Sequence, residues 1–538
     1  MKSSKGKMVA VFFALAVLIF AAVYYYITLP AINIHASGFW LFIFSVLLIA
    51  MLIYVFRRKI KYDDTIEEMK EKKLLKISLL ILVALVVVYL VGTILSSPIV
   101  NAKKYRELIT VENREFSEDI HQVDYSQIPL LDKDSASLLG NRKMGSMVDM
   151  VSQFEVSDIY SQINYNGKPV RVTPLVYASP IKWLMNHSEG IPAYIMIDMA
   201  TQNTELVKLE NGIRYSQSEY FNHRIDRHLR FLYPTYIFDQ LSFEIDEEGT
   251  PYWICPVRDY TIGLFGGVTI GKVVLCNAIT GETVEYEIED CPQWVDRVFP
   301  ADMLIEQYDY YGELVNGYLN SVLGQSGCLQ TTEGYNYIAM EDDIWVYTGI
   351  TSVSGDESNV GFVLMNQRTH EVRYYQINGA EEYSAMDSAQ GQVQHLGYKA
   401  TFPLLINVAD QPTYFMALKD DAGLVKMYAM VNIQKYQNVA IGDTVGDCEK
   451  AYVEMLGKNG ISADYTDSAE TITGNIETIA QTVVDGNSRF YLMLSQSDLI
   501  FEVEFADNID IIRYKEGDKI TLTYLDKGDV SSVLSIDD

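Results

Sequence analysis

Apolar residues are concentrated in three uninterrupted segments within the first hundred positions of the chain. These segments are Met8 to Leu29, Gly38 to Phe56 and Ile77 to Leu95, and none of them contains a charged side chain. About 20 apolar residues in a helix span the hydrocarbon core of a bilayer, whereas a helix in a soluble core carries a polar face. The pattern therefore predicts three transmembrane helices, in a membrane anchor of residues 1–97.

Basic residues beside these segments predict their orientation. The N-terminal tail carries Lys2, Lys5 and Lys7, and the loop from Arg57 to Lys76 is rich in Lys and Arg, whereas the loop from Pro30 to Ser37 carries no formal charge. Lys and Arg close to a span tend to stay in the cytoplasm. We therefore expect a multi-pass cell-membrane protein with a cytoplasmic N-terminus and an extracytoplasmic region after the third span.

A cleaved signal peptide is the alternative interpretation of the first segment, because a basic tail precedes it. The apolar core of a signal peptide is about 7 to 15 residues long. The first segment is longer, and it continues through Tyr24, Tyr25 and Tyr26, an aromatic cluster typical of a membrane interface. The pattern favours a span that is retained.

Strand-like patterns repeat after a juxtamembrane connector of residues 98–145. In three places an apolar strand reaches a short polar turn, and a second strand then alternates apolar and polar residues, as in a β-hairpin. These hairpins are Ala193 to Leu209, Lys272 to Ile288 and Gly361 to Ile377. Another hairpin signal precedes each of them, at Tyr165–Lys168, Asp246–Gly249 and Glu341–Asp343. A helix-like stretch follows each of them, at Ser218–Phe231, Gln293–Leu323 and Ala380–Leu396.

Two hairpins and a helix are enough to form a four-stranded sheet with a helix on one face. We therefore expect three tandem α+β units, at residues 146–235, 236–325 and 326–440. A fourth hairpin signal, from Thr413 to Val431, completes or extends the third unit.

The pattern changes after residue 440. Gly442 to Gly460 predicts an amphipathic helix, which forms most of a linking segment at residues 441–464. Short alternating strands are then expected in residues 465–538, at Ile472–Ile479, Arg489–Leu494, Ile500–Phe505, Ile509–Tyr514 and Lys519–Tyr524. Five strands in so short a stretch indicate a small barrel that resembles an OB-fold, which often binds oligonucleotides or oligosaccharides. The expected fold class is thus three N-terminal transmembrane α-helices, extracytoplasmic α+β repeat domains and a C-terminal small β-barrel.

The turn within Val274 to Val284 resembles the hairpin of PepSY-like domains, which are small extracytoplasmic α+β modules of bacterial peptidase propeptides and envelope proteins. The second repeat carries Asn277, Thr280, Gly281 and Glu282 together, whereas the first and third repeats have polar residues in place of Gly281. The whole chain also resembles an uncharacterised bacterial family of three-helix membrane proteins with a large outer region. The resemblance implies a binding, inhibitory or regulatory module rather than a catalyst.

Acidic residues dominate the part of the chain beyond the anchor. Residues 97–538 hold 31 of the 42 Lys and Arg but 66 of the 71 Asp and Glu, which leaves them near −35. Such a charge repels phosphate backbones and is typical of a well-solvated exterior. The barrel segment alone carries 5 Lys and Arg against 15 Asp and Glu, the wrong sign for a groove that follows a nucleic-acid backbone. Nucleic acid is therefore not expected as a partner.

The segment from Gly266 to Lys272 satisfies the G-x-x-x-x-G-K part of a P-loop. Val273 stands where a Ser or Thr should bind the metal, and the following residues predict a strand rather than a helix. A glycine-rich link between two hairpins explains the segment, so no nucleotide is expected as a ligand.

A basic cluster stands out in the acidic region, and apolar residues at helical spacing accompany it. The cluster consists of His223, Arg224, Arg227, His228 and Arg230. Its two histidines are five positions apart, so they do not share a helix face as two metal ligands would. Salt bridges to neighbouring carboxylates are the favoured role. Docking of an acidic partner or of a membrane surface is the alternative.

The chain has an odd number of cysteines, all of them beyond the anchor: Cys255, Cys276, Cys291, Cys328 and Cys448. Their spacing includes no C-x-x-C, so neither a zinc site nor a disulfide scaffold is implied. Cys255 and Cys276 lie in strand-like runs, where we expect them to pack as small buried apolar residues.

Motifs of catalysis are missing from the sequence, which contains neither G-x-S-x-G nor H-E-x-x-H, although triads scattered along a chain escape such a search. Acidic residues at Asp246–Glu248, Glu341–Asp343 and Asp420–Asp421 fall at hairpin tips, where turns favour Asp and water solvates charge. They lack the spacing of a calcium loop. We therefore expect no catalytic, cofactor-binding or metal-binding residue, and weak cation binding at these tips is the alternative.

These patterns indicate a membrane-anchored extracytoplasmic protein of the cell envelope. It is expected to bind or regulate a protein, peptide or glycan partner, with the lipid bilayer as its other partner and without catalysis. Two alternatives stay open: a cell-envelope hydrolase with dispersed catalytic residues, and an accessory subunit of a membrane complex. Spans without a charged residue offer no ion path of their own.

Overall fold

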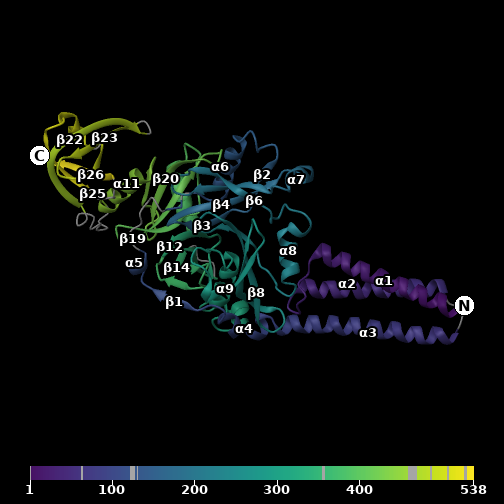
Figure 1. Ribbon diagram of the computed structural model, residues 1–538. Helices are drawn as coiled ribbons and strands as arrows, with labels where there is room; N and C mark the ends of the chain where they lie inside the picture. Colours follow the sequence, from purple (N-terminus) through teal and green to yellow (C-terminus); the bar gives the residue numbers. More distant parts are fainter. Residues whose placement is uncertain are drawn as a thin grey trace. The chain divides into compact units, whose positions relative to one another are not determined.

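The computed structural model divides the chain into two compact units. Unit 1 comprises Met1–Arg114 and Pro129–Ile377, and unit 2 comprises Glu115–Ile128 and Asn378–Asp538 (Figure 1). The structure describes residues 2–61, 65–120, 128–129, 131–353, 358–458, 469–484, 487–505, 508–525 and 530–537. Of the two helix ends expected, Gly457 and Gly460, the second lies outside these ranges, and so do the side chains of most basic residues that predict the orientation of the anchor.

Unit 1 begins with three long helices, α1 (Lys2–Thr28), α2 (Ser37–Lys61) and α3 (Thr65–Leu95). Two stretches, Ser37–Val55 and Leu75–Leu95, are long and apolar enough to cross a membrane, and α1 contributes a shorter apolar stretch, Ala14–Thr28. Only 6% of the residues in each long stretch are buried. Apolar helices with so little burial match the composition expected of a membrane anchor, because a soluble core helix would bury such a face.

The residues after α3 do not form a separate connector. Helix α4 (Pro98–Arg106) follows directly, and β1 (Val111–Arg114) pairs in parallel with a strand more than 250 residues later, at Val111↔Val372. Asp132 caps the N-terminus of helix α6 (Lys133–Gly145), because its side chain accepts a hydrogen bond from Ser135 N. Its Ala136 and Met144 are buried. The range 98–145 is thus divided among other elements of the fold.

The first repeat is an antiparallel sheet with the order β2-β4-β5-β6, and β3 also pairs with β4. Its elements are β2 (Phe154–Val156), β3 (Ser161–Tyr165), β4 (Lys168–Tyr177), α7 (Pro180–Asn186), β5 (Ile191–Asp198), β6 (Thr204–Ile213) and α8 (Ile225–Leu232). Both hairpins predicted here are present. Asn166 and Gly167 have φ of 50° and 75°, the positive values that a tight turn of this kind needs.

The second and third repeats are also antiparallel meanders, and each contains its two predicted hairpins. The second has the order β10-β9-β8-β7, with β7 (Ser242–Ile245), β8 (Pro251–Ile262), β9 (Gly266–Asn277), β10 (Thr283–Glu287) and then α9 (Ala301–Glu313). The third consists of β11 (Leu329–Thr331), β12 (Asn336–Met340), β13 (Asp343–Ser352), β14 (Ser358–Asn366) and β15 (Val372–Tyr375).

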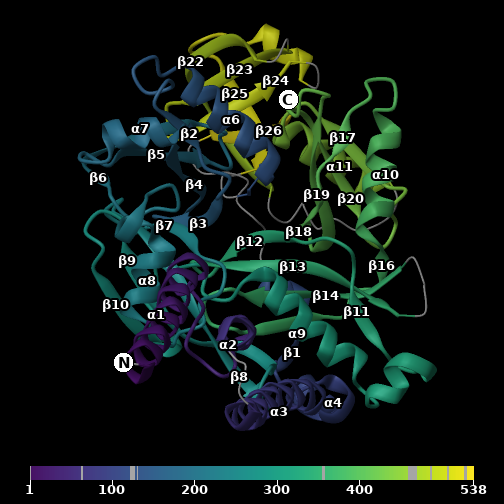
Figure 2. The same ribbon diagram turned by 90° about the vertical axis from the view of Figure 1, so that its right-hand side faces the viewer.

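These two repeats share one hydrophobic core around α9. Leu304 and Tyr308 of α9 belong to the same buried cluster as Ile254 and Leu275 of the second sheet and Val363 of the third. One helix therefore covers faces of two sheets (Figure 2). The repeats are recognisable in the sequence as separate units, but the second and third do not close separate cores.

Unit 2 contains a fourth meander where the sequence indicated one additional hairpin. It consists of α10 (Glu382–Gln392), β17 (Lys399–Ala400), β18 (Leu404–Val408), β19 (Gln411–Lys419), β20 (Val425–Asn432), β21 (Val439–Gly442) and α11 (Val445–Lys458). The range 326–440, expected as one unit, therefore holds two sheets. The turn between β18 and β19 is made by Ala409 and Asp410, both with positive φ. Because this turn contains no glycine or asparagine, the sequence carries no hairpin signal at that point.

The chain ends in five strands that pair in a closed order, β22-β23-β24-β26-β25. They are β22 (Ala469–Val484), β23 (Asn487–Leu494), β24 (Ile500–Glu504), β25 (Lys519–Leu525) and β26 (Val530–Asp537). The strand predicted at Ile509–Tyr514 is wrong, because Ile509–Arg513 is a 3₁₀ helix. Ile511 is buried, whereas Ile509 and Ile512 are exposed, so the apolar alternation there does not mark a sheet face. The fifth strand is β26, which the sequence pattern did not indicate.

Candidate functional site

The apolar helices contact the repeats of unit 1 through residues that are far apart in the sequence. The tip of the β8–β9 hairpin lies against the end of α3. Ser96 Oγ accepts hydrogen bonds from the backbone N–H groups of Leu264 and Phe265 at 2.8 and 3.1 Å and donates to Gly92 O at 2.7 Å. Ser96 is 2% exposed, and its carbonyl accepts from the Tyr105 hydroxyl at 2.6 Å. The hairpin tip is therefore fixed by both its backbone and its surroundings.

Aromatic residues of α2 and α3 surround the same hairpin tip. The Phe265 ring lies 4.9 Å from the Tyr89 ring and 6.3 Å from the Trp40 ring, centroid to centroid. His35 Nδ1 donates to Leu264 O at 2.8 Å. A β-carbon on Gly92 would come within 2.7 Å of Leu264 Cδ1, so a glycine at this position allows the close approach. Polar residues are usual at a hairpin tip, but this tip carries Leu264 and Phe265. These two apolar residues were the signal in the sequence that could have predicted the contact.

The predicted basic helix forms a second connection to the anchor. Arg230 of α8 is 9% exposed and donates to four backbone carbonyls: Leu29 at 2.9 Å, Tyr236 at 2.6 Å, Tyr233 at 3.2 Å and Pro234 at 3.4 Å. Leu29 follows the last residue of α1, where a cation also favours the helix dipole. Burial lowers the pKa of Arg230, but a guanidinium keeps its charge in proteins.

Other residues of the basic cluster bind carbonyls and rings rather than carboxylates. The Arg227 guanidinium lies 4.1 Å from the centre of the Tyr26 ring. His228 Nε2 donates to Gly281 O at 2.8 Å. Within the part of the chain that the structure describes, the cluster's ion pair is that of Arg224 with Asp226, at 3.3 Å. Salt bridging as the main role of the cluster is therefore wrong, because helical spacing turns Arg227 and Arg230 toward the anchor.

The turn between β9 and β10, which carries Asn277, Thr280, Gly281 and Glu282, belongs to this junction. Gly281 has φ +77°, and a β-carbon there would lie 2.3 Å from the Tyr215 ring. The Tyr215 ring in turn lies 4.4 Å from the ring of His228. Trp253 Nε1 donates to Tyr215 O at 2.8 Å. The glycine is thus required both by its backbone conformation and by the ring packed on it.

We expect Gly281→Ala to lower the stability of the protein by about 1–3 kcal/mol, because overpacking adds to backbone strain at positive φ. Gly167→Ala is the matched control, since Gly167 has φ +75° and a β-carbon there would meet no atom within 4 Å. The melting temperatures of the two variants measure the difference. Equal losses would show that the Tyr215 contact contributes nothing.

The segment from Gly266 to Lys272 is neither a phosphate cradle nor a linker. It forms the first half of β9, and Lys272 Nζ pairs with Glu285 at 2.7 Å and with Glu287 at 2.9 Å. These hydrogen bonds raise the pKa of Lys272. Its side chain is occupied by two carboxylates, which would compete with any phosphate.

Lys272→Ala should leave the melting temperature of the protein nearly unchanged, because exposed ion pairs contribute little. ATP with magnesium should also produce no thermal shift in the wild-type protein. A nucleotide-dependent shift that the variant loses would contradict this interpretation of the segment.

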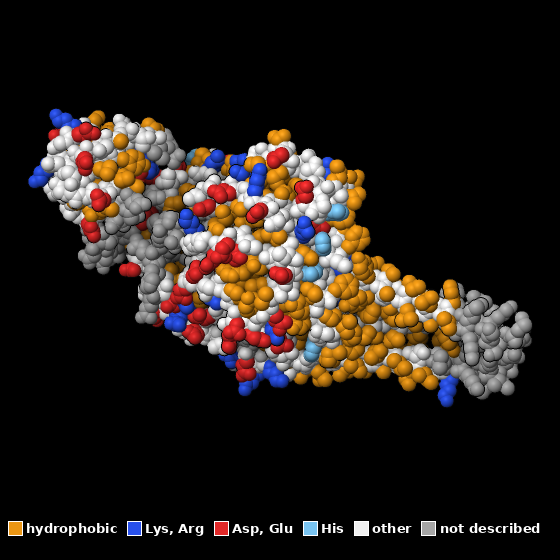
Figure 3. Space-filling view, in the orientation of Figure 1, with side chains coloured by type: hydrophobic (Ala, Val, Ile, Leu, Met, Phe, Trp, Pro, Cys, Tyr) orange, Lys and Arg blue, Asp and Glu red, His pale blue; other side chains and the backbone are white. Residues whose placement is uncertain are grey.

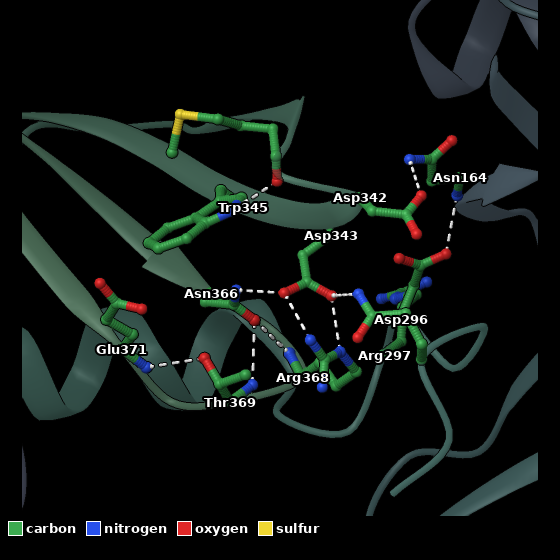
Figure 4. Close-up of polar contacts among 12 residues, drawn as sticks. Asn164, Asp296, Arg297, Asp342, Asp343, Trp345, Asn366, Arg368, Thr369 and Glu371 are labelled. Carbon is green, nitrogen blue, oxygen red and sulfur yellow. Dashed lines mark hydrogen bonds and ion pairs between the residues drawn. The ribbon is translucent and has the colours of Figure 1, made fainter. Parts of the chain in front are cut away.

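Of the three acidic residues at the third hairpin tip, Glu341 and Asp342 are exposed as expected, but Asp343 is not. Asp343 is 4% exposed and accepts from Arg368 Nε at 2.6 Å and Arg368 Nη2 at 2.8 Å. Asn366 Nδ2 donates to the same carboxylate at 2.8 Å (Figure 4). Glu341 pairs with Arg373 at 2.8 Å. The Asp343 carboxylate is therefore a buried polar contact within unit 1 and is not free to bind a cation.

Two more carboxylates are buried beside this contact. Glu244 is fully buried and accepts from the backbone N–H groups of Asp296 and Arg297 at 2.9 and 3.1 Å, and from Ser242 Oγ at 3.0 Å. Burial raises its pKa to about 7. Asp296 is 1% exposed and accepts from Asn164 N at 2.7 Å, while its Oδ1 has no hydrogen-bond partner among the described residues. Burial and the Glu244 charge raise the pKa of Asp296, so Asp296 keeps its proton to a higher pH than a free carboxyl group does.

A protonated carboxyl group here predicts an unusual pH dependence. An acid whose native pKa is raised binds its proton more tightly when folded, so stability falls as pH rises from the unfolded pKa of roughly 4 toward the native pKa. Each unit of difference contributes about 1.4 kcal/mol. Asp296→Asn, which stays neutral, should therefore raise the melting temperature at pH 8 and flatten its fall between pH 5 and pH 8. Glu244→Gln should instead lower the melting temperature at both pH 5 and pH 8. Three donors face the Glu244 carboxylate, and the amide nitrogen of Gln cannot accept a hydrogen bond from any of them.

The cysteine side chains lie in the interior of the fold. All five cysteines are buried thiols, and burial raises the pKa values of Cys276 and Cys291 to about 12, so these thiols stay protonated. Among the described residues, no group of three His, Cys, Asp or Glu side chains is placed to hold a metal ion. The junction of anchor and repeats is thus the strongest candidate for a functional site, and its chemistry is that of an interface.

A comparison with protein-family models gives no match to the chain, and a comparison with curated proteins gives none either.

Proposed function

We propose that the chain is a membrane-anchored binding or regulatory protein of the cell envelope that works without catalysis. Three spans would hold it in the membrane, with the N-terminus in the cytoplasm and the sheet repeats on the outer side. The three apolar helices and the basic residues beside them support this topology. PepSY-like repeats and an OB-like barrel at the C-terminus remain part of the proposal.

The observation that carries this proposal is the junction itself. Ser96 holds the β8–β9 hairpin through two N–H groups, and Arg230 joins α8 to the end of α1. A flexible tether would need neither contact. The second sheet, which includes β8 and β9, is therefore held at a fixed position relative to the anchor, as suits a protein that presents a binding surface close to a bilayer.

The edge strands of two sheets supply a surface to which an extended polypeptide could bind. Strand β6 lies at one end of the first sheet, and β10 lies at one end of the second. Half-buried and exposed residues alternate along much of β6, and Val284 of β10 is 51% exposed. Such an edge accepts an extended peptide as an added strand. A peptide or an unfolded segment of an envelope protein is the partner that this chemistry favours.

Topology is tested with single cysteines at Ser3 and Asp421 of the full chain in intact cells. The native cysteines are buried, so an impermeant reagent should label the introduced residue at position 421 alone. Equal labelling of both positions would contradict the proposed orientation.

Binding is tested with a photo-crosslinking residue at Val284 in intact cells, with Val148 as the matched control. Val148 is 86% exposed and apolar, but it lies in a loop rather than on a sheet edge. We expect a discrete adduct with a defined polypeptide from position 284 and none from position 148. The absence of an adduct at Val284, or turnover of a substrate by the purified full chain in activity profiling, would contradict a non-catalytic binding role.

A further inference from the structure

Helix α7 presents an apolar face that no described side chain covers. Ile181, Leu184 and Met185 are 69%, 64% and 69% exposed, and their spacing places them on one side of the helix. The opposite side is fixed. Trp183 Nε1 donates to Glu219 at 2.6 Å, and the Tyr177 hydroxyl donates to the same carboxylate at 2.7 Å. Because Glu219 is 3% exposed, Trp183 is held inward and the apolar face is held outward.

Contacts lead from α7 to the outer end of α1. The Trp183 ring lies 4.6 Å from the Tyr220 ring and 6.0 Å from the Phe221 ring. Phe221 O accepts from Arg227 Nη1 at 2.8 Å, and the Arg227 guanidinium lies over the Tyr26 ring. Tyr26 belongs to the tyrosine cluster near the end of α1. The apolar face of α7 is therefore continuous with the aromatic end of the anchor.

Exposed apolar side chains around α8 extend this surface. Phe221 is 65% exposed, and Phe231 and Leu232 are each 50% exposed. Phe231 also contacts the rings of Tyr25 and Tyr26. In Figures 1 and 2, α7 lies beyond α8 when seen from α1, at the end of unit 1 from which the helices run. Figure 3 shows hydrophobic side chains gathered at this end, together with histidines.

We propose that this surface, formed by Ile181, Leu184, Met185, Phe221, Phe231 and Leu232, lies in the interfacial layer of the bilayer that the anchor occupies. The proposal rests on the membrane anchoring proposed above. Short amphipathic helices bind in this way, with the apolar face at the boundary of headgroups and acyl chains. Lys182 on the same helix suits the headgroup layer, since amphipathic helices that lie in the interface carry Lys and Arg beside their apolar face. The lipid, rather than a soluble partner, is the occupant because the surface continues directly from the anchor.

The consequence is a second attachment of the first repeat to the membrane. The spans contact the second repeat through the β8–β9 hairpin and the first repeat through α8, at the end of that repeat. Helix α7 lies elsewhere in the first repeat, between β4 and β5. With α7 in the interface, the first sheet cannot rotate away from the membrane. The edge strand β6 of that sheet would then keep a constant distance from the lipid surface.

Quenching by brominated lipids tests this proposal on the full chain in nanodiscs that hold one copy each. A bimane probe is attached to Leu184→Cys, and separately to Ile181→Cys in case one variant fails to fold. The unsubstituted protein sets the background, because its five cysteines are buried. Val87→Cys on α3, where the native side chain is 51% exposed, is the positive control. Val148→Cys, in a loop after α6, is the negative control.

We expect bromolipids to reduce the emission of probes at positions 184 and 181 as well as 87, but not at 148. Quenching at position 87 without quenching at 184 and 181 would overturn the lipid-facing surface and leave the anchor intact. In that case, access of iodide to position 184 would mean a solvated face, and protection from iodide would mean that protein covers it. A lack of quenching at position 87 would instead overturn the membrane anchoring itself.

Discussion

Arg230→Ala is expected to lower the free energy of unfolding of unit 1 by about 3 kcal/mol or more, because a charged donor contributes roughly 1.5–3 kcal/mol and buried acceptors left without a donor add to the loss. The guanidinium satisfies four backbone carbonyls, including that of Leu29 at the end of α1. Arg230→Lys should recover little of this, since an ammonium group cannot reproduce the planar fork. Thermal unfolding of the purified full chain in detergent measures the effect.

The matched control is Arg224→Ala, which removes an exposed arginine of the same cluster. Its ion pair with Asp226 has side chains that are 48% and 40% exposed, so we expect almost no change in melting temperature. Hydrogen exchange adds a local measurement. The N–H of Ile32 donates to Pro234 O at 2.7 Å, and its exchange should become faster in Arg230→Ala but not in Arg224→Ala. Unchanged exchange at Ile32 would show that Arg230 does not hold the junction.

Asp343→Asn is expected to destabilise unit 1 by about 3 kcal/mol, because removing one partner of a buried ion pair leaves the other charge uncompensated. Both nitrogens of the Arg368 fork that contact Asp343 would lose their anionic acceptor. Asp342→Asn is the matched control one residue earlier. Asp342 is exposed and makes its hydrogen bond, at 2.8 Å, with Asn164 Nδ2, so the loss should stay below about 1 kcal/mol.

A double variant separates charge from packing at this pair. Replacing both residues, as Asp343→Asn with Arg368→Met, removes the uncompensated cation and should restore part of the stability lost in Asp343→Asn. Melting temperatures of the single and double variants measure this coupling. If the losses of the two single variants simply add in the double variant, the two side chains act independently. That result would contradict the coupling expected from their bidentate contact.

Local patterns predicted the hairpins of the first three repeats because each is determined by neighbouring residues. Alternation of apolar and polar positions gives a strand two faces, and a turn such as Asn166-Gly167 adopts positive φ at little cost. Helices α9 and α10 also lie within the stretches predicted for them, and α8 ends one residue beyond its predicted stretch. The fourth meander was only partly visible, since Ala409 and Asp410 form a turn without a glycine.

Local patterns were misleading where a side chain's environment comes from distant segments. Asp343 follows a turn and belongs to an acidic run, features typical of a solvated tip, yet Arg368 and Asn366 enclose its carboxylate. Ile509 to Tyr514 alternates like a strand, yet the structure has a 3₁₀ helix there. The composition of a short segment does not tell which other segment will cover it.

The apolar helices of the anchor and the succession of hairpins and helices could be predicted from the linear pattern, because hydrophobic periodicity and turn chemistry act over a few residues. Three contacts could be seen only in the folded chain: the β8–β9 hairpin packs on Ser96, Arg230 binds the carbonyl at the end of α1, and α9 packs against two sheets. These contacts join residues up to about two hundred positions apart. They depend on buried donors finding acceptors in space, and a linear pattern carries no record of that pairing.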